Sequence, residues 1–320
     1  MSLASDLDGL RKGGLLISGD DRAWITMRGK DAPDFLQRIL TSDVHQLAPG
    51  SGQWSAMLDG KGHWISDVLL YALPDAEEVP SFGLDIPIEQ RDVVLQKLEM
   101  MHFGEALEFE GTDLQQLLIL TDGAPAHVFG VENANEHGPD TWILQRPDRG
   151  VNCTAHLLPA AAVADCTDAL QQAGAVLGDA ATLEHLRIRA FRPRWGADFD
   201  ADTTLPNCNE WQRSSITKGC YAGQEVIAKI NTYGEAPRQL CQLRFATAAA
   251  TVDFTGAELR NDAGKRMGKL SSYTLLEDGS AVGLGMLRRR AAVEGGAVVA
   301  VLEEAQEMAG VVHLPEKVFG

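Results

Sequence analysis

The sequence has no apolar run long enough to cross a membrane, although 45% of its 320 residues are hydrophobic. A membrane-spanning helix needs roughly 20 consecutive apolar residues. The opening segment from Met1 to Arg11 carries charges where a secretory signal peptide would carry its apolar segment. We therefore expect a cytoplasmic protein that does not enter a membrane.

Cysteine is scarce, and its occurrences are odd in number and widely spaced. They are Cys153, Cys166, Cys208, Cys220 and Cys241. The sequence has no C-x-x-C pair and no histidine partner at zinc-finger spacing, which argues against a disulfide framework and a self-contained metal site. An iron–sulfur cluster held by this chain alone is not expected either, because such clusters usually take four thiolates. We expect no metal, and any link to such clusters would run through a partner protein.

Basic residues are outnumbered, with 28 Lys and Arg against 45 Asp and Glu and a net charge of −17. A broad nucleic-acid footprint needs a basic face, so we expect no nucleic-acid partner. A small anionic ligand is still compatible with this charge, because the basic residues gather locally. Two such groups are Arg187, Arg189, Arg192 and Arg194, and then Lys218, Lys229 and Arg238.

The order of the elements predicts an α+β protein of two or three packed units, because strands and helices mix without strict alternation. Strands are expected at 15–18, 23–27, 53–58, 63–73, 106–110, 114–121 and 151–157, and helices at 31–40, 88–101, 159–174 and 180–190. We expect a loop-rich segment at 130–149. Short strands at 239–246, 269–275, 282–288 and 297–301 then predict a small barrel or sandwich, with a boundary near residue 236.

The segment from Lys218 to Glu225, K-G-C-Y-A-G-Q-E, places one cysteine between two glycines and beside a lysine. Glycine permits left-handed backbone or a close approach to a ligand. The apolar residues after Gly223 predict a short helix there, and its N-terminus together with Lys218 would favour the thiolate of Cys220. We interpret Cys220 as a reactive thiol. The alternative is an inert, buried cysteine.

This segment resembles the signature of the YgfZ-type folate-binding proteins, relatives of the glycine cleavage aminomethyltransferase (T-protein) that are tied to iron–sulfur cluster assembly and repair. The resemblance covers nearly the whole chain. Its other motifs are Gly29 to Gln37, Thr41 to Val44, Asp59 to Gly62 with Asp67, Leu186 to Ile188, and Pro193 to Asp198.

The resemblance implies two intertwined α+β folate-binding subdomains in residues 1–235 and a small β-barrel in residues 236–320. It implies tetrahydrofolate or a derivative as ligand, and iron–sulfur assembly or client proteins as partners. Cys220 and Lys218 are the expected catalytic residues. The expected folate-binding residues are Met57, Arg187, Arg194, Trp195, Tyr221, Gln224, Glu225 and Arg238.

Two functions follow from the resemblance, and one departure bears on both. Arg189 stands where aminomethyltransferases keep a glutamate for the pterin ring, and a guanidinium offers only donors. The alternative to an assembly factor is a tetrahydrofolate-dependent aminomethyltransferase. The cysteine motif favours the assembly factor, because aminomethyl transfer works by positioning and a carboxylate and uses no thiol.

Overall fold

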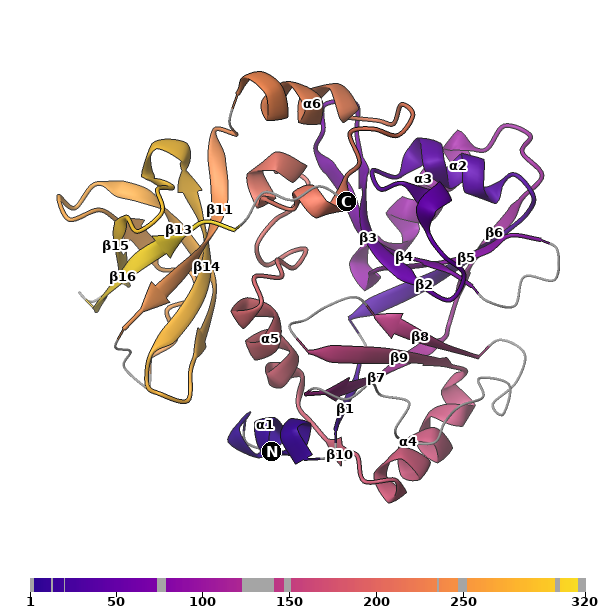
Figure 1. Ribbon diagram of the computed structural model, residues 1–320, viewed down its shortest axis with the longest axis horizontal. Coiled ribbons are helices and arrows are strands. Elements are labelled where there is room, and N and C mark those ends of the chain that lie inside the picture. The colour runs from indigo at the N-terminus through magenta and orange to yellow at the C-terminus, as the bar shows by residue number, and fades with distance from the viewer. Residues whose placement is uncertain are drawn as a thin grey trace. The chain divides into compact units, whose positions relative to one another are not determined.

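The computed structural model describes residues 3–12, 14–19, 21–73, 79–122, 141–146, 151–234, 236–246, 252–302 and 306–315. The chain divides into two compact units. Unit 1 comprises Met1–Leu58, Ile65–Leu183 and Thr217–Ala222, and unit 2 comprises Asp59–Trp64, Glu184–Ile216 and Gly223–Gly320. Figure 1 labels the helices and strands.

Two five-stranded sheets make up the described strands of unit 1, and the chain passes from one to the other and back. The first, in the order β10-β1-β7-β9-β8, contains β1 (Leu15–Ser18), β7 (Gln115–Thr121), β8 (Trp142–Arg146), β9 (Asn152–Leu158) and β10 (Val176–Leu177). The second, in the order β3-β4-β5-β2-β6, contains β2 (Arg22–Arg28), β3 (Gly52–Leu58), β4 (Trp64–Ala72), β5 (Ser81–Pro87) and β6 (Glu108–Thr112). This exchange between sheets is the intertwining that the resemblance implied.

The helices of unit 1 form because their apolar residues recur at helical spacing. They are α1 (Leu3–Lys12), α2 (Ala32–Ile39), α3 (Arg91–Met101) and α4 (Val163–Gln172). The apolar stripe of α2, including Phe35 and Leu36, is buried against the second sheet together with Val94 and Leu98 of α3. Asp31 directly precedes α2, and its carboxylate accepts a hydrogen bond from the Ala106 backbone N–H at 2.7 Å instead of capping the helix.

The second sheet is buried on both faces, as the alternation of side chains along its strands shows. Ile25 of β2 and Leu70 of β4 pack under α2 and α3, whereas Trp24 and Tyr71, their neighbours in sequence, lie in a second core. That core also contains Trp142 of β8 and Leu157 of β9, so the two sheets pack on each other. Strand periodicity of two places successive side chains on opposite faces.

Unit 2 contains α6 (Gln224–Tyr233) and a closed antiparallel barrel in the order β11-β14-β13-β12-β15-β16. The strands are β11 (Arg238–Phe245), β12 (Glu258–Arg260), β13 (Arg266–Leu275), β14 (Ala281–Arg288), β15 (Ala297–Val301) and β16 (Glu307–His313). α5 (Ala180–Arg189) leads into the unit, and its Ile188 packs against Leu240 and Leu284 of the barrel. The α+β fold class and the C-terminal barrel are therefore confirmed. The barrel begins at Arg238, and the domain boundary near residue 236 stays a prediction.

One expected segment is partly wrong. We predicted a loop over 130–149, but residues 142–146 form β8, which pairs in antiparallel fashion with β9. Trp142 and Leu144 of β8 are buried in the core between the sheets. This burial stabilises a strand whose sequence is too short to predict it. The remainder of the predicted loop lies outside the described residues. Among the helices that the structure describes, none is long and apolar enough to cross a membrane.

Candidate functional site

Cys220 is the one exposed cysteine of the chain, since the other four are buried. Burial raises the pKa of Cys166 and Cys208, and it raises the pKa of Cys241 to about 12. A protonated, buried thiol reacts slowly, because the thiolate is the nucleophile. The accessible thiol chemistry of the described residues is therefore concentrated at Cys220.

Lys218 fastens the cysteine segment to the end of α2. Its side chain is buried, and Nζ donates hydrogen bonds to the carbonyl oxygens of Leu40 at 2.6 Å and Ser42 at 2.7 Å. The ammonium also lies 5.0 Å from the centroid of the buried Tyr221 ring, within cation–π range. Burial lowers the pKa of Lys218 to about 8, against the opposing charge of Asp43.

Met57 lies beside Leu40, whose carbonyl oxygen binds Lys218. The two residues form an isolated antiparallel β-bridge, and Met57 is fully buried. The Thr41–Val44 motif holds the same turn, because the Thr41 hydroxyl accepts a hydrogen bond from the Ala56 N–H at 2.9 Å. Unit 1 thus brings Met57, Lys218 and Tyr221 together around the end of α2, and Cys220 lies between the last two in sequence.

The second glycine of the cysteine motif is required by its backbone and its surroundings. Gly223 is the N-cap of α6 with φ of 80°, a left-handed conformation. A Cβ there would lie 2.9 Å from the carbonyl oxygen of Asp59 and from the Cα of Gly62, so unit 2 packs the two motifs directly together. Gln224 and Glu225 occupy the first turn of α6, where Glu225 is exposed and favourably placed for the helix dipole.

Arg187 donates its hydrogen bonds to other residues of unit 2. Nε and both terminal nitrogens of its buried guanidinium donate to Glu184, Asp198, Ser272 and the Arg192 carbonyl oxygen. Asp198 in turn accepts hydrogen bonds from the hydroxyl groups of Ser271 and Ser272. These bonds tie the Pro193–Asp198 motif to the barrel and use all five guanidinium protons, which leaves none for a ligand in this conformation.

The other two arginines among the expected folate-binding residues are exposed. Arg194 pairs with Glu184, with its Nε 2.8 Å from a carboxylate oxygen. Arg238 begins β11, where it pairs with Arg288 of β14. Trp195 is buried edge-on to Phe199, with ring centroids 5.8 Å apart. The expected site residues thus fall into both units.

Sequence reasoning missed the residues that hold the expected ones in place. Asp198 is the buried partner of Arg187, and the carbonyl oxygens of Leu40 and Ser42 bind Lys218. Both lie in or beside motifs recognised in the sequence, Pro193–Asp198 and Thr41–Val44. The motifs indicated that these segments matter, but the contacts between their residues depend on tertiary packing and could not be predicted from the sequence.

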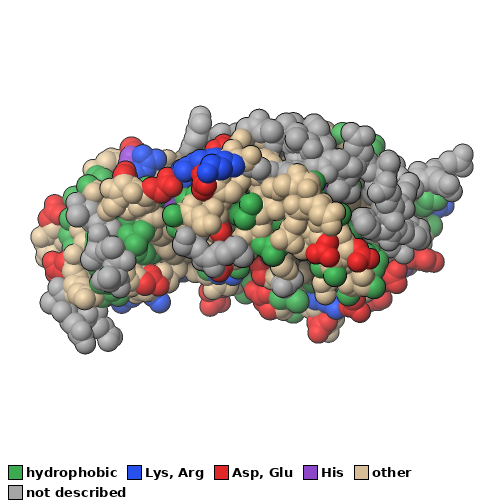
Figure 2. Space-filling model, turned by 90° about the horizontal axis from the view of Figure 1, so that it is seen from below, with side chains coloured by type: hydrophobic (Ala, Val, Ile, Leu, Met, Phe, Trp, Pro, Cys, Tyr) green, Lys and Arg blue, Asp and Glu red, His purple; other side chains and the backbone are tan. Residues whose placement is uncertain are grey.

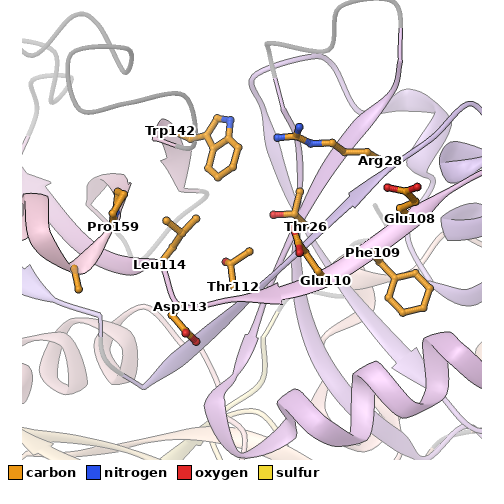
Figure 3. Close-up of a pocket in the computed structure, with 11 residues that line it drawn as sticks. Thr26, Arg28, Glu108, Phe109, Glu110, Thr112, Asp113, Leu114, Trp142 and Pro159 are labelled. Carbon is orange, nitrogen blue, oxygen red and sulfur yellow. The ribbon is translucent and has the colours of Figure 1, made fainter.

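A pocket of about 610 Å³ lies within unit 1, away from the residues expected from the sequence. Figure 3 shows Trp142 and Pro159 on one side and Thr26 and Arg28 on the other. Its charged lining residues are Arg28, Glu108, Glu110 and Asp113. No group of three or more His, Cys, Asp or Glu side chains in the described part of the chain could hold a metal ion.

Comparison with known proteins gives matches along most of the chain. No protein-family model matches it. The chain is 26% identical over 262 residues to the mitochondrial iron–sulfur cluster assembly factor IBA57 of Homo sapiens, covering 78% of this chain and 72% of that protein. It is 27% identical over 290 residues to the tRNA-modifying protein YgfZ of Vibrio vulnificus, covering 84% and 82%.

A shorter match and a solved structure complete the comparison. A stretch of 126 residues is 34% identical to a chloroplast protein of Arabidopsis thaliana, but it spans only 39% of this chain and 28% of that protein. The fold matches the glycine cleavage aminomethyltransferase T of Bartonella henselae with a TM-score of 0.82 and 20% identity, over 99% of this chain and 90% of that one. The chain is therefore similar in sequence to YgfZ-type proteins over most of its length, and it shares the fold of aminomethyltransferase T.

Proposed function

We propose that this protein supports iron–sulfur cluster assembly or repair as a folate-binding factor, and that its Cys220 thiol carries the functional step. The human relative is named as an iron–sulfur cluster assembly factor. The partners would then be iron–sulfur assembly or client proteins, reached in the cytoplasm.

The observation that carries the proposal is the contrast between Cys220 and the other cysteines. Cys220 is exposed in a segment anchored by the buried Lys218, while every other cysteine is buried. A thiol that only filled space would be expected in the core, where cysteine behaves as a small hydrophobe. Holding an exposed thiol on an anchored segment suits reaction with a small oxidant or exchange with a partner protein.

The glutamate tail and the pterin ring of tetrahydrofolate or a derivative require different binding groups. The exposed guanidinium groups of Arg194 and Arg238 suit the glutamate carboxylates, which arginine binds in bidentate fashion. The pterin ring is matched less well, because the exposed Arg189 offers only donors where an acceptor is needed. We therefore propose that the tail supplies more of the binding free energy than the ring does.

A second candidate is a tetrahydrofolate-dependent aminomethyltransferase, favoured by the match to aminomethyltransferase T over almost the whole chain. A likeness at 20% identity supports a shared fold, and one fold serves many activities. The exposed thiol has no place in aminomethyl transfer, so we keep this function as the alternative.

The test separates ligand binding from thiol function. Tetrahydrofolate and 5-formyltetrahydrofolate are titrated into the wild-type protein and into Cys220→Ser, and each gene is expressed in cells that lack their own YgfZ-type protein. We expect both proteins to bind folate and only the wild type to restore iron–sulfur enzyme activity. Cys166→Ser is the matched control and should restore activity. Full rescue by Cys220→Ser would refute a functional thiol.

A further inference from the structure

We infer that the barrel of unit 2 carries a binding site for a small anion with two or three linked phosphate groups. The site is a pocket of about 500 Å³, within the range of small-ligand sites. Its charged lining residues are Lys265, Arg266, Arg288, Arg289 and Arg290. None of the lining residues that the structure describes is acidic.

Two ordered backbone segments form the walls of this pocket. One is the β12–β13 hairpin, whose turn is closed by the Asn261 side-chain oxygen accepting from the N–H groups of Ala263 and Lys265, at 3.1 and 2.9 Å. The other is the 3-10 turn Arg289–Ala291 directly after β14. The Arg289 N–H donates to the Pro237 carbonyl oxygen at 3.1 Å and fixes this turn to the start of β11. The pocket therefore has a defined backbone frame.

Three of the five basic side chains in the pocket have no acidic partner within the described residues. Arg266 lies 3.3 Å from a carboxylate oxygen of Glu258. Within the described residues, Lys265, Arg288 and Arg290 have no ion-pair partner, and all three side chains are exposed. Arg238 also faces Arg288 across the β11–β14 ladder. Like charges this close repel one another, and a bound anion would relieve that repulsion.

A basic cluster is unusual in a protein with such a negative net charge. Its net charge is −17, and acidic side chains are scattered over the face shown in Figure 2, whereas basic ones gather in few places. A basic pocket in such a protein attracts a compact anion more readily than a long polyanion, which would also meet the surrounding carboxylates.

Phosphate suits the pocket better than carboxylate. A terminal phosphate group carries about two negative charges and three acceptor oxygens, so two or three linked groups can contact several cations at once. Arginine matches phosphate through its planar pair of donors. Pro237, Met267 and Ala291 add apolar lining that could contact an uncharged part of the ligand.

The experiment measures binding of inorganic triphosphate and of ATP by calorimetry, at fixed ionic strength and without folate. The double variant Arg288→Gln with Arg290→Gln should weaken triphosphate binding by about tenfold or more, because it removes two charge-assisted contacts. Arg244→Gln is the matched control, since Arg244 is an exposed arginine near the other end of β11. It should change the dissociation constant by less than about twofold. Thermal unfolding of each variant checks that the barrel is intact.

The two ligands distinguish the sources of phosphate. Tighter binding of ATP would identify a nucleotide, and equal binding would identify the inorganic chain; both outcomes support the site. Equal binding of triphosphate to the wild type and to the folded double variant would overturn it. Tighter binding of a short RNA duplex than of triphosphate, lost in the same double variant, would also overturn it and assign the patch to RNA. No outcome depends on the proposed folate function.

Discussion

Asp85 of β5 and Arg146 of β8 form a buried ion pair that joins the two sheets of unit 1, with carboxylate oxygen and guanidinium nitrogen 2.8 Å apart. Asp85 also binds Arg22 of β2, whose Nε lies 2.5 Å away, and Arg22 pairs with Asp67 of β4. Gln116 of β7 accepts a hydrogen bond from Arg146 at 2.9 Å. Asp85 therefore bridges two buried guanidinium groups from different sheets, one of which also pairs with Asp67.

Removing this carboxylate should destabilise unit 1. Asp85→Ala leaves Arg22 and Arg146 partly unpaired in the core, and we expect a loss of about 3–5 kcal/mol in the free energy of unfolding. Asp8→Ala is the control, because the Asp8–Lys12 pair is exposed and should contribute about 0.5 kcal/mol at most. Urea unfolding monitored by tryptophan fluorescence measures both. Equal losses would contradict the assignment.

The same pair predicts a pH dependence. Burial alone would raise the pKa of Asp85, but Arg22 and Arg146 outweigh it and hold the pKa below its usual range. A carboxylate with a lowered folded-state pKa contributes stability fully above its unfolded pKa of about 3.9, and this contribution is lost as the pH falls through the lower folded value. The stability difference between wild type and Asp85→Asn should therefore stay constant down to about pH 4 and shrink below it.

Alkylation should single out Cys220. At neutral pH, iodoacetamide should modify Cys220 at least about tenfold faster than any other cysteine, because the other thiols are buried. Peptide mapping by mass spectrometry gives the individual rates. In denaturant all five cysteines should react at similar rates, which serves as the control. Earlier modification of Cys153 or Cys241 in the folded protein would be inconsistent with this structure.

The lowered pKa of Lys218 predicts that the free energy of unfolding rises at alkaline pH. Burial lowers its pKa from 10.5 to about 8, so the folded protein disfavours the charged form. Between these two values the unfolded chain binds more protons than the folded one, and stability relative to Lys218→Met should rise by about 1–3 kcal/mol from pH 8 to 10.5. Unfolding of both proteins across that range measures the difference. A difference that does not change with pH would show that the ammonium is better solvated than its burial implies.

Local sequence predicted the fold where the pattern is local. The helix over 31–40 and the strands over 53–58 and 63–73 were predicted from neighbouring residues, and α2, β3 and β4 confirm them. Helix α1 and the strands β5, β10, β12 and β16 were not predicted. For β10 and β16 there is a physical reason. The two residues of β10 are exposed and pair with β1, which is far away in sequence, while β16 closes the barrel by pairing with β11 and β15. Such pairings depend on tertiary structure and leave little local signal.

The local structure around the cysteine motif was predictable from the sequence, but its contacts were not. The cysteine motif predicted a reactive thiol at Cys220 and a helix that starts near Gly223. Cys220 is exposed and α6 begins at Gln224, whereas the reactivity of the thiol stays a prediction. It placed Lys218 beside Cys220 as an electrostatic partner, whereas Nζ binds carbonyl oxygens of Leu40 and Ser42, more than a hundred residues earlier. No spacing rule connects residues that far apart.

Exposed arginines should discriminate between folates by their tails. Arg238→Ala should weaken binding of a polyglutamylated folate by about tenfold and leave binding of a bare pterin nearly unchanged, because in the proposed site the guanidinium would contact only the tail carboxylates. Fluorescence titration of both ligands gives the two ratios. Arg260→Ala, another arginine of the barrel, is the control. Equal losses for the two ligands would move Arg238 out of the tail site.

An assay of aminomethyl transfer decides between the two candidate functions. A lipoyl carrier bearing an aminomethyl group is mixed with tetrahydrofolate and the protein, and methylene-tetrahydrofolate and ammonia are measured. We expect no appreciable rate above the uncatalysed exchange. A side chain accelerates a reaction only where its interactions strengthen in the transition state. Aminomethyl transfer makes no use of a thiolate, and Arg189 offers no acceptor to the pterin. An authentic aminomethyltransferase in the same mixture is the positive control. Robust turnover that survives Cys220→Ala would replace the assembly factor with the transferase, because it would show catalysis that does not need the residue on which the first proposal rests.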